Sequence, residues 1–163
     1  MTPALIRRLT VDPTLDWLAG VGIPSGRGAR CLVLAIGAQE SGFTSRVQVP
    51  VAHAKGFWQF EAGGGVRGVL SHPNTQKEAL ATCAALVVPA TVNGVWMALE
   101  HNDALACVFA RLLLWSDPQA LPFEEEPAWQ AYLRCWRPGK PDRARWTAAW
   151  SAAGEAMKGG API

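Results

Sequence analysis

Charged side chains are scarce in this sequence. Only 17% of the 163 residues are Asp, Glu, Lys or Arg, whereas 50% are hydrophobic. A chain of this length and composition can bury a real core, which excludes disorder as its global state. The net charge of +2 is too small to indicate nucleic-acid binding. We therefore expect one globular domain with no nucleic-acid partner.

Metal-binding and disulfide patterns are also lacking. The four cysteines are far apart, no CxxC motif occurs, and no two of the three histidines have ligand spacing. We expect four separate buried thiols, no metal and no cofactor. The run GGGVRG from Gly63 to Gly68 lacks the Lys-Ser/Thr of a phosphate-binding loop.

Long apolar runs are absent as well. The first 17 residues, MTPALIRRLTVDPTLDW, contain no uninterrupted apolar segment of the kind found in export signals. No stretch reaches the roughly 18 apolar residues of a membrane span. The sequence predicts neither a signal peptide nor a membrane-spanning helix.

One apolar segment does stand out, because it ends in a carboxylate. Residues 31–38, CLVLAIGA, carry no charge, and Glu40 follows immediately before Ser41-Gly42. We expect a central buried helix over residues 28–40. A carboxylate at the end of such a helix lies against apolar walls, which raises its pKa and suits it to general acid catalysis.

A second block follows at a short distance, and together the two blocks resemble a known family. Glu40-Ser41-Gly42-Phe43 and then Gly56-Phe57-Trp58-Gln59-Phe60 are similar to the signature of lytic transglycosylases in the lysozyme-like superfamily. Trp58 stands where the family usually has Met, and no Ala-Tyr-Asn-Ala-Gly block follows downstream. The run GFWQFE with its glycine-rich tail also resembles small proteins encoded by bacteriophages of Gram-negative hosts.

The resemblance implies roles for individual residues. Glu40 corresponds to the catalytic general acid and base, and Gln59 to a glutamine that contacts sugar in the cleft. Ser41 either orients the carboxylate or only ends the helix. Phe57 and Trp58 flank Gln59, one facing the sugar and the other the core.

Glu61 is a candidate second catalytic carboxylate. A partner for Glu40 would allow hydrolysis through an activated water or a covalent intermediate. Glu61 is equally consistent with a solvated residue or a partner for Arg67. Asp117, after a later apolar helix, is a weaker candidate for the same role.

The rest of the chain predicts further helices. Capping and apolar spacing place them at 3–9, from Asp12 to Gly20, at 75–88, at 91–100, at 104–115, from Pro127 through Trp136, and after Asp142. Asp12, Asp103 and Asp142 are the expected N-caps of three of them, and Thr75 to Glu78 form a capping box that opens the helix at 75–88. The stripe of Trp129, Tyr132 and Trp136 is interpreted as a face packed on the core. Val47 to Val51 suggest an extended piece, and 57–61 a short helix or a cleft wall.

We therefore expect a mainly α, lysozyme-like single domain over residues 1–163 with at most a small β-hairpin. Within it, residues 1–27 form an N-terminal helical segment, 28–158 a catalytic core and 159–163 a frayed tail. The implied function is cleavage of peptidoglycan glycan strands, as a lytic transglycosylase or a muramidase-type hydrolase. The mild positive charge suits this anionic polymer.

The implied setting is a bacteriophage. A bacteriolytic enzyme of this kind acts as an endolysin that passes from the host cytoplasm to the periplasm and cell wall, or as a virion component with other virion proteins as partners. The alternative is a non-catalytic lysozyme-like scaffold in a virion, tail or ejection apparatus. An enzyme should have Glu40 in a concave, solvent-reachable site with Gln59 facing it, whereas a structural scaffold should have that groove filled or covered by a partner.

Overall fold

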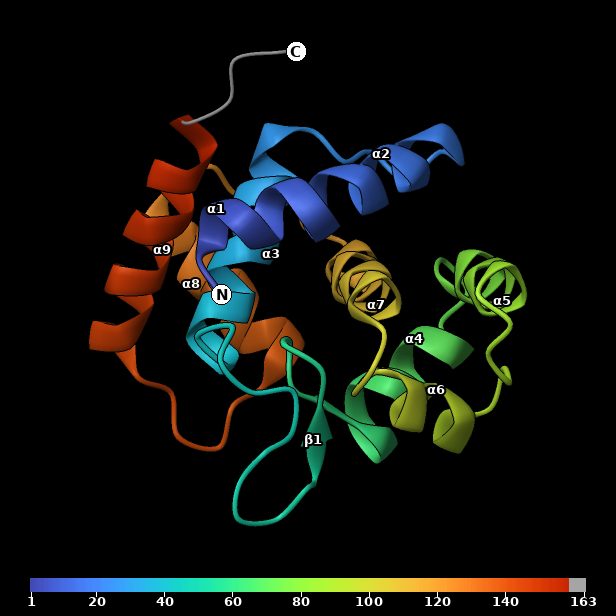
Figure 1. The fold of residues 1–163 in the computed structure, drawn as a ribbon. Helices are drawn as coiled ribbons and strands as arrows, with labels where there is room; N and C mark the ends of the chain where they lie inside the picture. The colour runs from blue at the N-terminus through green and yellow to red at the C-terminus, as the bar shows by residue number, and fades with distance from the viewer. Residues whose placement is uncertain (159–163) are drawn as a thin grey trace.

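The computed structural model describes residues 1–158 and is mainly α-helical, with a single two-stranded hairpin. Figure 1 shows the helix α3 running through the middle of the molecule, with α9 beside it and the hairpin below. This arrangement confirms the predicted fold class. The expected tail at 159–163 lies outside the described residues.

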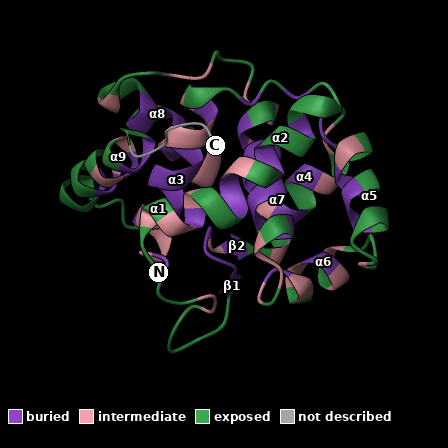
Figure 2. Cartoon of the chain, turned by 45° about the horizontal axis from the view of Figure 1, so that its top comes forward, coloured by how far each residue is buried: buried purple, intermediate pink, exposed green. Residues whose placement is uncertain are grey.

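Helix α3 (Arg27–Glu40) is the central element that the apolar run predicts. Eight of its residues are buried, and it packs along α9 (Arg143–Lys158), with α7 (Asp103–Ser116) also against it. Figure 2 shows α3 and α7 as the most continuously buried helices. The helix ends where Gly42 adopts a φ of 60°, the left-handed conformation in which glycine is favoured.

The N-terminal segment is more continuous than its sequence predicts. Helix α1 (Pro3–Ile6), the π-helical turn η1 (Arg7–Val11) and α2 (Asp12–Gly20) follow one another without a break. The prediction that Asp12 caps a new helix is therefore wrong. Its carboxylate instead accepts hydrogen bonds from Arg7 and Arg30, each at 3.0 Å. Because these two arginines pair with the Asp12 carboxylate, the carboxylate does not accept a hydrogen bond from a backbone amide of α2.

A tight hairpin follows the central helix. Strand β1 (Ala54–Lys55) pairs antiparallel with β2 (Phe60–Glu61), and Val47 adds an isolated bridge to Lys55. Gly56 and Gln59 turn the chain with φ values of 74° and 51°. The predicted short helix at 57–61 is wrong, because left-handed Gln59 is incompatible with helical continuation.

The glycine-rich segment after the hairpin forms a π-helical turn, η2 (Ala62–Val66), that leads into α4 (Arg67–Ser71). A Cβ on Gly65 would lie 2.6 Å from the Phe60 ring, so glycine allows this turn to pack on the hairpin. Three glycines in a row predict either a flexible or a closely packed turn, and the structure shows the closely packed one.

The second half is helical, as expected. It consists of α5 (Gln76–Ala85), α6 (Val92–Ala98), α7, α8 (Glu125–Trp136) and α9. Thr91 and Asp142 cap α6 and α9, accepting hydrogen bonds from the amides of Gly94 and Arg145.

Two predicted caps are wrong. Asn102 rather than Asp103 caps α7, because the Asp103 carboxylate instead pairs with Arg46. The Thr75 hydroxyl donates to the Val69 carbonyl at 2.7 Å, so it does not form a capping box.

The four cysteines are free thiols, two buried and two partly buried, so no disulfide joins them. Trp58 and Trp146 are fully buried, and both act as core fillers. Among residues 1–158, no helix combines the length and apolar character that crossing a bilayer requires.

Candidate functional site

A large open cleft crosses the molecule beside the end of α3. Its volume is about 1360 Å³, and its walls come from the hairpin with η2 and α4, from the end of α7, and from the end of α8 with the loop that leads to α9. Three segments far apart in sequence therefore meet at one site. The cleft lining includes Glu40, Gln59, Glu61, Asp117 and Tyr132.

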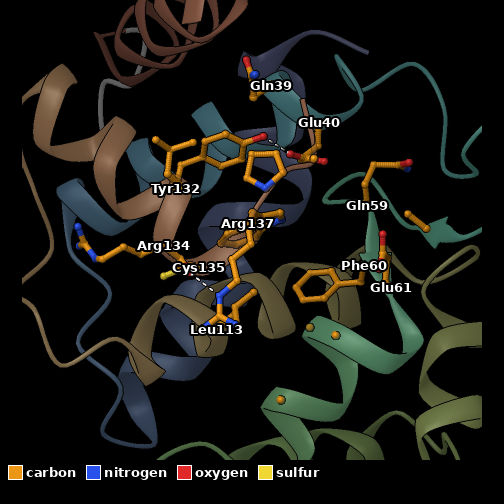
Figure 3. A pocket seen from close by; sticks show the side chains of 18 of the residues that line it. Gln39, Glu40, Gln59, Phe60, Glu61, Leu113, Tyr132, Arg134, Cys135 and Arg137 are labelled. Carbon is orange, nitrogen blue, oxygen red and sulfur yellow. Dashed lines mark hydrogen bonds between the residues drawn. The ribbon is translucent and has the colours of Figure 1, made fainter. Parts of the chain in front are cut away.

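Glu40 occupies the position that the buried helix gives it. It is the last residue of α3, and its side chain is partly buried in the cleft wall. The Tyr132 hydroxyl donates a hydrogen bond to Glu40 Oε1 at 2.6 Å (Figure 3). The carboxyl group is thus held in one orientation by a side chain 92 residues away in sequence.

Burial raises the pKa of Glu40 above its ordinary value, and the Tyr132 hydrogen bond and the positive charge of Arg145 oppose that rise. A carboxyl group whose pKa is raised keeps its proton at higher pH than an exposed glutamate does. This is the property that a general acid requires. The opposing contacts favour the carboxylate that remains once the proton has been donated.

Gln59 and Glu61 lie on the hairpin side of the cleft, across from Tyr132 (Figure 3). The Gln59 amide donates to the Gly56 carbonyl at 2.8 Å, which fixes the side chain within the turn. Glu61 is exposed on β2. Among residues 1–158 it has no ion pair, so the suggested pairing with Arg67 is not formed.

The aromatic residues beside Gln59 belong to the core. Trp58 is 0% exposed and donates to the Val33 carbonyl at 2.8 Å. Phe57 is also buried and packs edge-on against Phe43, with centroids 5.5 Å apart. Neither lines the cleft, so the expectation that one of them faces the sugar is wrong. The left-handed Gln59 turns the chain so that both rings point inward.

The Ser41 side chain makes its hydrogen bonds at the C-terminal end of α3. Its hydroxyl donates to the Gly37 carbonyl at 3.2 Å and accepts from the Phe43 amide at 3.1 Å. The sequence left two roles open for Ser41, orienting the Glu40 carboxylate or ending the helix, and these contacts are those of a helix end. No hydrogen bond joins Ser41 to Glu40 in the described part of the chain.

Asp117 does lie in the cleft, but its carboxylate forms an ion pair with a neighbouring arginine. Arg134 donates to its Oδ2 through Nε and Nη2, at 3.0 and 2.8 Å. Cys135 Sγ lies 3.8 Å from the same oxygen, and burial together with Asp117 raises the pKa of this thiol to about 12. Asp117 is thereby a structural ion-pair partner, and Cys135 is held as an unreactive thiol.

Tyr132 is the site residue that sequence reasoning missed. Its ring does pack on the core as predicted, stacked on Trp146 with centroids 5.1 Å apart. Its hydroxyl nevertheless reaches the cleft. A signal existed in the sequence: this is the only tyrosine, and a buried phenol requires a hydrogen-bond partner.

No group of three or more potential metal ligands occurs within residues 1–158.

Comparison of the chain with models of protein families, with curated proteins and with solved structures finds no match.

Proposed function

We propose that this protein cleaves the glycan strands of peptidoglycan, with Glu40 as the general acid and then the general base. The observation that carries this proposal is the position of Glu40 in an open cleft, with its pKa raised by burial and its carboxyl group held by Tyr132. The resemblance of the two sequence blocks around Glu40 and Gln59 supplies the substrate class.

In the proposed reaction, protonated Glu40 donates its proton to the glycosidic oxygen as the C1–O bond breaks. The resulting carboxylate accepts the hydrogen bond from Tyr132, which is stronger to an anion than to a neutral acid. Glu40 then takes the proton of the muramyl C6 hydroxyl while that oxygen attacks C1. The products are a free sugar hydroxyl and a 1,6-anhydro ring, and Glu40 regains its proton.

Glu61 supports a hydrolytic variant of this chemistry. It lies in the same cleft, is exposed and has no ion pair among residues 1–158. A free carboxylate in this position is suited to activate a water molecule. The transglycosylase route needs no second carboxylate, so the products distinguish the two reactions.

The alternative of a non-catalytic virion scaffold predicts a groove that is filled by side chains or covered by a partner protein. The cleft at Glu40 is open, and Gln59 lines it together with the carboxyl group. This observation supports the enzymatic proposal over a scaffold whose groove is filled by its own side chains.

The test is digestion of purified peptidoglycan, with the soluble fragments identified by mass spectrometry. Wild type is compared with Glu40→Gln and with Glu124→Gln, a matched control in an exposed residue outside the cleft. Wild type and the control should release anhydromuramyl fragments, and Glu40→Gln should release none.

Fragments one water heavier would establish hydrolysis and make Glu61→Gln the next variant. The absence of any release by folded wild type would refute the enzymatic proposal.

A further inference from the structure

One side of the cleft is lined by cations. Arg137 and Lys140 come from the loop after α8, and Arg145 comes from the first turns of α9. These three residues, here called the basic wall, are all exposed. The hairpin side instead presents Gln48, Gln59 and Glu61, with no cation among them, while Arg67 of α4 and Asp142 at the start of α9 also line the cleft.

The charges of the basic wall are not neutralised within the protein. Arg134 nearby is paired with Asp117, but no carboxylate among residues 1–158 forms an ion pair with a basic-wall residue. Arg145 contacts the Ala38 carbonyl at 3.4 Å, and Arg137 contacts the Arg134 carbonyl at 3.3 Å. Their remaining donors are available to a ligand.

The backbone conformation of Arg137 is uncommon for a residue other than glycine. Arg137 ends α8 in the left-handed conformation, with φ 49° and ψ 52°. Glycine is the residue that this position favours, and a non-glycine residue there costs roughly 1 kcal/mol. Its Nε donates to the Arg134 carbonyl at the end of α8, which leaves the other guanidinium donors without a helix-capping contact. Pro138 and Pro141 restrict the loop that carries Lys140 next to it.

We propose that the basic wall binds the carboxylates of the peptide stems on peptidoglycan and makes the enzyme selective for strands that carry charged stems. This inference rests on the proposed function. The peptide stem branches from the muramyl residue, the sugar that the reaction places beside Glu40. A strand in the cleft with its stems toward the basic wall brings anionic groups to Arg137 and Lys140, while its other edge faces Gln59.

The experiment compares three preparations of soluble glycan strands. The first carries intact stems. The second carries stems whose carboxylates have been converted to amides, and the third has its stems removed, which leaves the lactyl carboxylate on the sugar. The protein variants are Arg137→Ala/Lys140→Ala and the matched control Arg8→Ala/Lys77→Ala. The control removes two exposed cations that lie outside the cleft and form no ion pair among residues 1–158. Arg145 is left intact, because its charge also acts on Glu40.

We expect wild type and the control to cleave strands with intact stems about tenfold faster, as kcat/KM, than strands with amidated stems, as two exposed charge pairs would provide. The cleft variant should cleave both at the slower rate. The wild-type preference should decrease as salt is added, because exposed charge pairs are screened.

Equal wild-type rates on intact and amidated strands would overturn the inference while leaving the proposed function in place. Stem-free strands, whose carboxylate is the lactyl group on the sugar, should be cleaved more slowly than intact ones. Equal or faster cleavage of stem-free strands would also overturn the inference, because the stem carboxylates would then give no selectivity over a carboxylate on the sugar itself. A cleft variant that keeps the wild-type preference would refute the role of these two residues.

Binding separates this inference from the proposed function. Glu40→Gln should bind intact strands more tightly than amidated ones, and adding the Arg137→Ala/Lys140→Ala changes should remove the difference. If wild type cleaves no preparation, the proposed function fails, and this binding difference alone decides whether the basic wall recognises stem carboxylates.

Discussion

Replacement of Tyr132 by Phe is the sharpest test of how the site works. The substitution removes one hydroxyl from a side chain that is 2% exposed, together with its 2.6 Å hydrogen bond to Glu40. The ring stacking on Trp146 remains possible, because the ring itself is unchanged. The variant therefore perturbs the carboxyl group rather than the core.

The size of the effect follows from the charge that Glu40 acquires as it donates its proton. A hydrogen bond contributes roughly 1 kcal/mol to a neutral acceptor and about 1.5–3 kcal/mol to a charged one. The transition state thus loses about 0.5–2 kcal/mol more than the ground state. We expect Tyr132→Phe to lower kcat roughly 2- to 30-fold.

The pH dependence should change in a defined direction. The Tyr132 hydrogen bond lowers the pKa of Glu40, so its loss should raise that pKa further. The alkaline limb of the rate profile, which requires protonated Glu40, should move to higher pH. Titration of the Glu40 carboxyl carbon by NMR measures the same change without relying on activity.

Thr82→Val is a suitable control, because it removes another buried hydroxyl, which donates to the Glu78 carbonyl at 2.7 Å in α5, outside the cleft. It should leave kcat and the Glu40 pKa unchanged in the folded protein. A Tyr132→Phe variant with wild-type kcat and an unchanged or lowered Glu40 pKa would refute the assigned role of Tyr132.

Two further predictions concern stability. The folded-state pKa of Glu40 lies above its unfolded value of about 4.5, so the folded protein binds more protons above that pH, and stability falls as pH rises through the folded pKa. Glu40→Gln removes this pH-dependent loss of stability, so the Tm of the variant should exceed that of wild type at about pH 7 and equal it near pH 4. Variant and wild type with the same Tm at both pH values would contradict the burial of the charged carboxylate. Gly37→Ala places a Cβ against the Phe43 ring and should cost about 1–3 kcal/mol, whereas Gly154→Ala, in α9 with nothing within 4 Å of the added Cβ, should add about 1 kcal/mol. Chemical denaturation measures both, and equal destabilisation by the two changes would contradict the packing around Gly37.

Local patterns in the sequence determined the framework of this protein. The apolar run at 31–38 predicted the central helix, and the carboxylate after it predicted where an acid with a raised pKa would lie. Both depend on near-neighbour physics, namely helical periodicity and burial, which a single segment expresses by itself. The caps at Thr91 and Asp142 were predictable for the same reason, since a cap joins residues three positions apart.

Tertiary structure decided which side chains reach the site. The direction in which Phe57 and Trp58 point depends on the left-handed backbone at Gln59, which no apolar pattern reveals. Asp12 and Asp103 lost their predicted capping roles to distant arginines. The partner of Glu40, Tyr132, lies 92 residues away, and only the packing of α8 against the core brings its hydroxyl to the cleft. A contact of that sequence separation is set by the global fold. The sequence therefore determined the position of the Glu40 carboxyl group, and the tertiary structure determined which side chain hydrogen-bonds to it.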